Sequence, residues 1–172
     1  IQEYNEFYNL KSVINRCGVL TGPWQMGKVD QGVVVLWIAK HFWKKELKYI
    51  GFGGEGKQVR DILHINDLFN LLDIQINNFK DYNGKTFNVG GGNDVSISLS
   101  ELTKLCENVT GNKIKINKVK KNRSADIPIY ISDNSKVQKL SSWKPENSPT
   151  QIILDTFKWL KLNESILKNI LS

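Results

Sequence analysis

No stretch of about 18 or more apolar residues occurs in this chain of 172, which excludes a membrane-spanning helix. Cysteine is scarce: only Cys17 and Cys106 are present, so a dense disulfide framework is excluded and a reduced, cytoplasmic pair is expected. The opening residues, Ile1-Gln2-Glu3-Tyr4, contain neither an initiator methionine nor the apolar core of a signal peptide. Low-complexity segments and internal repeats are also missing. We therefore expect a globular cytoplasmic chain without a membrane partner, beginning inside a longer protein.

Positive charge is in excess, since 24 Lys and Arg against 17 Asp and Glu give a formal net charge of +7. Such a balance can indicate a nucleic-acid partner. Here, however, lysines and acids are interleaved, and the densest basic cluster, residues 113–123, alternates with Ile114, Ile116 and Val119 as a half-exposed strand does. We predict no nucleic-acid partner; strong salt-dependent DNA binding would be the sign of the alternative.

Helical and strand patterns alternate along the chain, which predicts an α/β fold. A capping box at Ser98 and Glu101 predicts one helix start, and Ser148-Pro149 predicts another. Strands are expected at 12–16, 47–50, 59–63, 86–89 and 114–119. Helices are expected at 1–9, 32–46, 66–79, 98–111 and 133–140 and from 148 to the end, with loops at 18–32 and 51–57.

The glycine-rich segment 51–56 fits the dinucleotide pattern G-x-G-x-x-G, and together with Lys57 and Gln58 it nearly matches a P-loop. Both motifs need a helix that opens within them and meets the phosphates with its N-terminus. Here a second strand pattern follows instead. We therefore interpret the segment as a flexible loop and not as a dinucleotide or P-loop motif.

Arg60 lies inside the apolar strand pattern at 59–63, where a guanidinium is costly to bury without an anion. A phosphate suits guanidinium geometry because it can accept two parallel hydrogen bonds. The strand therefore predicts a phosphate-binding arginine. The plainer alternative is a surface salt bridge to Asp61 or Asp67.

Six segments carry a common signature: 16–23, 56–68, 87–91, 98–102, 123–128 and 133–145. In this order they resemble the extended short-chain dehydrogenase/reductase family, which contains NAD-dependent nucleotide-sugar epimerases and dehydratases. The resemblance implies the C-terminal part of such an enzyme, namely the last Rossmann strands plus a small α/β substrate-binding domain. All of 1–172 would form the sugar-nucleotide-binding portion, with 1–22 and 84–112 contributing to the Rossmann core.

The resemblance also implies a nucleoside-diphosphate sugar as the ligand and assigns roles in binding it. Arg60 and Arg123 would hold the diphosphate, and Asp126 the ribose hydroxyls. Gln31 would contact the substrate. The plainer alternatives are a solvated loop arginine for Arg123, a turn former for Asp126 and a polar helix-start residue for Gln31. The base would meet backbone donors and acceptors on one strand edge, at Lys48 and Ile50.

NAD is the implied cofactor, and in this family it would be bound mainly by an N-terminal half that precedes Ile1. Arg16, Cys17 and Val19 would lie beside the nicotinamide, although Val19 replaces the usual Asn and Thr21 the usual Tyr. The family's catalytic Tyr-x-x-x-Lys pair would also lie upstream, since none of the 5 tyrosines here has Lys four residues on. No catalytic residue is therefore assigned, and the chain alone is expected to be inactive.

Within the family, Asp30-Gln31-Gly32 together with residues 56–61 is similar to the CDP-paratose 2-epimerase subfamily, which inverts the second carbon of a CDP-dideoxyhexose. That similarity implies the same reaction for the parent protein, as a homo-oligomer. The alternatives are a nucleotide-sugar 4-epimerase, a 4,6-dehydratase, or a catalytically inactive sugar-nucleotide-binding fragment.

Overall fold

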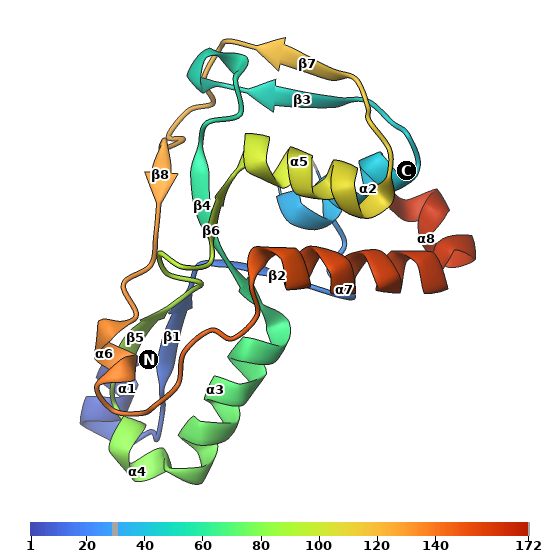
Figure 1. Cartoon of the computed structure of the whole chain (residues 1–172). Coiled ribbons are helices and arrows are strands. Elements are labelled where there is room, and N and C mark those ends of the chain that lie inside the picture. Colours follow the sequence, from blue (N-terminus) through green and yellow to red (C-terminus); the bar gives the residue numbers. More distant parts are fainter. Residues whose placement is uncertain (29–30, 172) are drawn as a thin grey trace.

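The computed structural model describes residues 1–28 and 31–171, which form two stacked parts joined by extended segments (Figure 1). The lower part contains α1 (Gln2–Tyr8), β1 (Ile14–Cys17), α3 (Ile65–Asn77), α4 (Phe79–Tyr82), β5 (Thr86–Val89) and α6 (Ser135–Gln138). The upper part contains α2 (Val33–Phe42), β3 (Leu47–Ile50), the short 3₁₀ helix η1 (Phe52–Gly54), α5 (Leu99–Thr110), β7 (Ile116–Val119), α7 (Pro149–Leu162) and α8 (Glu164–Leu171). Between them run β2 (Val19–Thr21), β4 (Val59–His64), β6 (Ser96–Ser98) and β8 (Ile129–Tyr130).

Strand β4 is the element that connects the two parts. Its first half pairs with β6 (antiparallel) and β8 (parallel), and its second half pairs in parallel with β2. Separate parallel pairs form from β1 and β5 in the lower part and from β3 and β7 in the upper part. Strand β4 begins beside the upper part and ends directly at α3 of the lower part, so residues at its two ends lie near different parts of the molecule (Figure 1).

Each part has its own apolar core. Helix α2 is buried on nearly every side, as expected of a helix apolar all round, and it packs with α5 and α7. The lower core gathers residues from β4, α3, β5 and α6 with Trp143. Helix α5 begins at the predicted capping box, where Ser98 Oγ accepts from Glu101 N at 3.2 Å and Glu101 accepts from Ser98 N at 2.8 Å.

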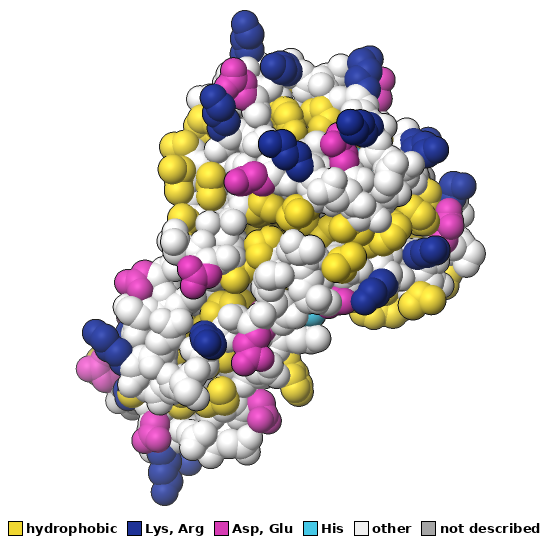
Figure 2. Space-filling model, in the orientation of Figure 1, with side chains coloured by type: hydrophobic (Ala, Val, Ile, Leu, Met, Phe, Trp, Pro, Cys, Tyr) yellow, Lys and Arg dark blue, Asp and Glu magenta, His cyan; other side chains and the backbone are white. Residues whose placement is uncertain are grey.

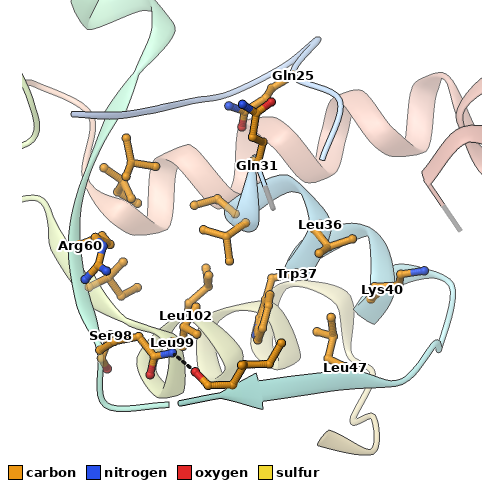
Figure 3. A pocket seen from close by; sticks show the side chains of 18 of the residues that line it. Gln25, Gln31, Leu36, Trp37, Lys40, Leu47, Arg60, Ser98, Leu99 and Leu102 are labelled. Carbon is orange, nitrogen blue, oxygen red and sulfur yellow. Dashed lines mark hydrogen bonds between the residues drawn. The ribbon is translucent and has the colours of Figure 1, made fainter. Parts of the chain in front are cut away.

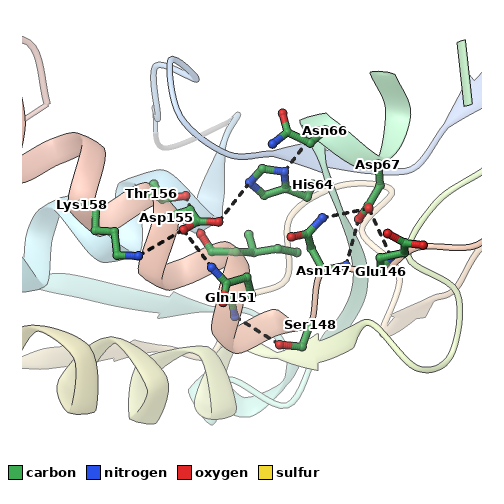
Figure 4. Close-up of polar contacts among 11 residues, drawn as sticks. His64, Asn66, Asp67, Glu146, Asn147, Ser148, Gln151, Asp155, Thr156 and Lys158 are labelled. Atoms are coloured by element: carbon green, nitrogen blue, oxygen red, sulfur yellow. Dashed lines mark hydrogen bonds and ion pairs between the residues drawn. The ribbon is translucent and has the colours of Figure 1, made fainter. Parts of the chain in front are cut away.

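A polar joint ties α3 of the lower part to the segment that leads into α7 (Figure 4). The buried Asp67 carboxylate accepts from the backbone N–H groups of Glu146 at 3.2 Å and Asn147 at 3.3 Å, and from the Asn147 side-chain amide at 2.8 Å. Nearby, His64 caps α3 by accepting from Asn66 N, and its Nε2 lies 4.0 Å from Asp155 on α7. Long-range hydrogen bonds therefore fix the angle between the two parts.

The predicted α/β class is confirmed, and the structure corrects several boundaries. The expected loop at 18–32 contains β2, and the strands β6 and β8 were not predicted. These strands have two or three residues each, too short for a readable alternation. The expected single C-terminal helix is two helices, α7 and α8, separated at Asn163. The glycine loop is followed by β4 and not by a helix, so it is neither a dinucleotide nor a P-loop motif.

Gly91 provides a test of the packing between β4 and the turn after β5. Gly91→Ala is expected to lower the free energy of unfolding by about 3 kcal/mol, the upper range for overpacking. An added Cβ would lie 2.2 Å from the Ile62 carbonyl oxygen. The control is Gly53→Ala, whose Cβ would meet nothing closer than 3.9 Å and costs only the left-handed backbone strain of about 1–2 kcal/mol. Equal midpoints in chemical denaturation would contradict the clash.

No helix within the described ranges is both long and apolar enough to cross a membrane. On the face shown in Figure 2, Lys and Arg side chains are scattered over the upper part with Asp and Glu side chains between them. This interleaving agrees with the sequence pattern from which no nucleic-acid partner was predicted.

Candidate functional site

A cavity of about 1070 Å³ lies between the upper part and the connecting strands, lined by α2, β3, β4, the start of α5 and the end of β1 (Figure 3). Its size is at the upper end of the range for ligand pockets, about 300–1,000 Å³. The walls are mainly apolar, from Leu36, Trp37, Leu99 and Leu102 among others, with polar side chains at separate points. A mainly apolar wall with a few fixed polar groups is typical of a small-molecule site.

The structure brings together side chains that the sequence analysis selected from distant segments. Arg16 is the exception: it precedes Cys17 on β1, so it points to the opposite face, where it is exposed. Asp30 lies outside the described residues. The predicted residues that line the cavity are Cys17, Val19, Gln31, Lys48, Ile50, Arg60, Arg123 and Asp126.

The partner of Arg60 is Asp126, because Arg60 Nη2 donates to Asp126 Oδ1 at 2.8 Å. Both side chains keep about a quarter of their surface exposed, at 25% and 23%. The alternative salt bridges to Asp61 or Asp67 are wrong. Asp61 accepts from backbone N–H groups of Gly92 and Ser132, and Asp67 belongs to the joint described above.

Further hydrogen bonds hold the Arg60 guanidinium in place. Its Nη1 donates to Val59 O at 2.7 Å, and its Nη2 donates to Ile127 O at 2.8 Å. The loop that Arg60 contacts also contains Arg123 and Ala125, and Ala125 takes a left-handed φ of 59°. A non-glycine residue there costs about 1–2 kcal/mol. The loop that carries Arg123 and Asp126 is thus strained and tied to β4 through Arg60.

One edge of β3 pairs with no strand among the described residues and faces the cavity. Leu47 N and Gly51 N donate to β7, so by alternation Lys48 and Ile50 direct their backbone groups to the other edge. Ile50 O accepts there from Gln58 Nε2 at 3.1 Å. Lys48 and Ile50 both line the cavity.

Two glutamines were missed as individual site residues. Gln58, 8% exposed, and Gln25 both line the cavity, and each donates its amide nitrogen to a carbonyl, Ile50 O at 3.1 Å or Leu20 O at 2.7 Å. These bonds fix the amide orientation. Each Oε1 is buried and finds no hydrogen-bond partner among the described residues, so each is an unsatisfied acceptor on a residue that lines the cavity. Only the tertiary contacts reveal this, since glutamine has no local signature.

Trp37 forms a rigid part of the wall, as Figure 3 shows beside Leu36 and Leu47. Its Nε1 donates to Thr103 Oγ1 at 3.0 Å, and Tyr49 OH lies 2.7 Å from the same oxygen. The two rings are stacked, with centroids 6.2 Å apart. Trp37 is 4% exposed, so it belongs to the core and at the same time lines the cavity.

The end of β1 forms the rim where the family resemblance places the cofactor. Cys17 and Val19 line the cavity there, and partial desolvation raises the pKa of the Cys17 thiol, although the residue is exposed at the rim. A Cβ at Gly18 would lie 2.9 Å from Ser132 Oγ, so the chain is tightly packed behind this rim. Carboxyl ends of parallel strands are where α/β proteins bind nucleotides. Cys17 therefore lies at the kind of strand end where α/β proteins bind nucleotides.

Both cysteines are free thiols, as expected, with Cys106 buried in the upper core. Within residues 1–28 and 31–171, no three His, Cys, Asp or Glu side chains gather as a metal site would require.

Known proteins match the chain over most of its length. The sequence profile of the family described as GDP-mannose 4,6 dehydratase matches residues 1–156. A CDP-paratose 2-epimerase from Salmonella typhi is 29% identical over 159 residues, which are 91% of this chain and 47% of that protein. A UDP-glucuronate 4-epimerase from Thermodesulfobacterium geofontis is 29% identical over 97% of this chain and 48% of that protein. The chain thus spans about half the length of these relatives.

Solved structures show the same fold. The epimerase Mth375 from Methanothermobacter thermautotrophicus superposes with a TM-score of 0.84 at 17% identity, covering 98% of this chain and 48% of that one. A dTDP-glucose 4,6-dehydratase from Bacillus anthracis, in complex with NAD, gives 0.80 at 24% identity, covering 98% and 50%. The predicted fold class is confirmed. The chain belongs to the GDP-mannose 4,6 dehydratase family of extended short-chain dehydrogenases, and it spans about half of such an enzyme.

Proposed function

We propose that the cavity binds a nucleoside-diphosphate sugar and that the chain is the substrate-binding part of an NAD-dependent nucleotide-sugar epimerase. The observation that carries the proposal is that Arg60, Arg123 and Asp126, from a strand and a distant loop, line one apolar cavity. Two guanidiniums at a single cavity suit a diphosphate. The relatives named above, which act on nucleotide sugars by their names, support the same ligand class.

The proposed ligand would lie with its diphosphate at Arg60 and Arg123. The base would meet the free edge of β3 at Lys48 and Ile50. Gln58 Oε1 lies on that side, because the Gln58 amide bonds Ile50 O. Gln58 and Arg60 are two positions apart and both line the cavity, so the base and diphosphate positions would be adjacent. The sugar would point to the other side, toward Gln25, Gln31 and Val19.

The proton-transfer chemistry is assigned to residues outside this chain. A Tyr-x-x-x-Lys pair supplies an acid/base group whose pKa the lysine lowers, and this pattern does not occur in the sequence. NAD, when bound, would accept and return a hydride. This chain would contribute the rim at Cys17 and Val19 and orient the sugar nucleotide, and the 172 residues alone would be inactive.

The finer proposal is inversion of the second carbon of a CDP-dideoxyhexose. It is supported by the similarity to the Salmonella typhi 2-epimerase and by an apolar cavity wall, which suits a sugar lacking hydroxyls. The second candidate is a 4-epimerase, favoured by the UDP-glucuronate 4-epimerase match. A 4,6-dehydratase and an inactive binding fragment stay open as alternatives. The cytoplasmic location and the homo-oligomer also remain predictions.

The test is to incubate the complete protein encoded by the gene with NAD and, separately, CDP-, UDP- and dTDP-linked hexoses, following the sugar by NMR. We expect epimerisation of a CDP-sugar by the complete protein and binding without turnover by the 172-residue chain.

Backbone hydrogen bonds to the base are worth about 0.5–1.5 kcal/mol each, so the preference for CDP over GDP should be about tenfold to a few hundredfold. Turnover of UDP-sugars alone would favour the 4-epimerase, and equal or tighter GDP binding would overturn the base assignment.

A further inference from the structure

The Arg60–Asp126 pair lies where the proposed function places the diphosphate. The guanidinium and the carboxylate are 2.8 Å apart, and both residues line the cavity. A diphosphate that binds Arg60 would take the position of the Asp126 carboxylate as the anionic partner. Asp126 and the ligand therefore compete for the same cation.

Arg60 does not depend on Asp126 for its position. Val59 O and Ile127 O each accept a hydrogen bond from the guanidinium, at 2.7 and 2.8 Å. These acceptors are backbone groups and remain when a carboxylate leaves. Asp126 Oδ1 also accepts from Ile127 N at 3.0 Å, and the loop before it contains the strained Ala125. The pair is thus built as a fixed cation and a displaceable anion on a strained loop.

A displaced carboxylate needs new hydrogen-bond donors, because an unpaired charge beside a bound anion is costly. The ribose of a nucleoside diphosphate offers two adjacent hydroxyls next to the phosphates. Inorganic phosphate and diphosphate lack such a neutral diol, and the P–OH protons they keep at neutral pH belong to the anion that Arg60 itself would bind. Displacement of the Asp126 carboxylate from Arg60 is therefore favourable when a nucleotide binds and unfavourable when a free anion binds.

Resting on the proposed function, we propose that Asp126 is a selectivity element: it occupies Arg60 until a nucleoside diphosphate displaces it onto the ribose hydroxyls. The site thereby rejects inorganic phosphate and diphosphate, although two arginines line it. Asp126 thus contributes to specificity through the anion it excludes as well as through the ribose it contacts.

The experiment is calorimetry on the complete protein with inorganic diphosphate, CDP and 2′,3′-dideoxy-CDP as probes. In Asp126→Asn we expect inorganic diphosphate to bind about tenfold or more tightly than in the wild type, because the competing charge is gone. CDP should gain less or lose affinity, so the CDP-to-diphosphate selectivity should fall about tenfold. The matched control is Glu46→Gln, which removes a carboxylate of the same cavity that pairs with Lys115 instead. It should leave that ratio within about twofold.

The dideoxy probe gives a readout on the unmodified protein, should Asp126→Asn fold poorly. Wild type should bind 2′,3′-dideoxy-CDP about tenfold more weakly than CDP, and the difference should vanish in Asp126→Asn. Equal binding of the two nucleotides to wild type, or an unchanged CDP-to-diphosphate ratio in the variant, would overturn the selectivity role while leaving the proposed function standing. Failure of the wild type to bind CDP at all would overturn both.

Discussion

Replacing Arg60 with alanine is expected to weaken CDP binding to the complete protein by about 2–5 kcal/mol, the range for removing one partner of a desolvated charge pair. The guanidinium is held in the cavity by Val59 O and Ile127 O, so little ordering remains to be done when the diphosphate binds. Isothermal calorimetry measures the change directly. Because the substitution also leaves Asp126 without its cation, the same measurement in an Asp126→Asn background separates the two contributions.

Two variants make the Arg60 result specific. Arg60→Lys keeps the charge but loses the forked geometry, so its affinity should lie between wild type and Arg60→Ala. Lys57→Ala removes a nearby exposed cation that pairs with Glu55 and does not line the cavity, and it should bind as wild type does. Equal affinities for Arg60→Ala and Lys57→Ala would place the diphosphate elsewhere.

Replacing Asp67 with alanine is expected to lower the free energy of unfolding by about 2–4 kcal/mol. The carboxylate is 1% exposed and receives hydrogen bonds from two backbone N–H groups, of Glu146 and Asn147, and from the Asn147 amide. Its loss leaves these donors without an acceptor at about 1–3 kcal/mol each when fully buried, and relaxation and water entry recover part of that. Urea denaturation followed by circular dichroism gives the change in midpoint.

Asp67→Asn should be milder than Asp67→Ala, because one carbonyl oxygen remains to accept from Asn147. Asp73→Ala is the matched control on the same helix, since Asp73 is exposed, and it should change stability by no more than about 0.5 kcal/mol. If Asp67→Ala and Asp73→Ala unfolded at the same urea concentration, the joint in Figure 4 would contribute nothing to stability.

The elements that the sequence predicted well are those with short-range causes. The capping box at Ser98 and the Pro149 start of α7 involve residues within one helical turn, and both are present in the structure. The glycine loop was separated from nucleotide-binding motifs because the next residues read as a strand, and they form β4. By contrast, β2 and β8 are strands only because they pair with β4, a contact with no local signal.

The sequence by itself determined the α/β class, the family, and eight of the residues that line the cavity, because motif order and periodicity are properties of neighbouring positions. Only the tertiary structure decided which groups meet. Arg60 pairs with Asp126 and not with Asp61 or Asp67. The amides of Gln25 and Gln58 bond the carbonyls of Leu20 and Ile50, which leaves their buried oxygens without a partner among the described residues. The partner of a partly buried charge can lie many tens of residues away in the sequence, as Asp126 does from Arg60, and no local pattern encodes that choice.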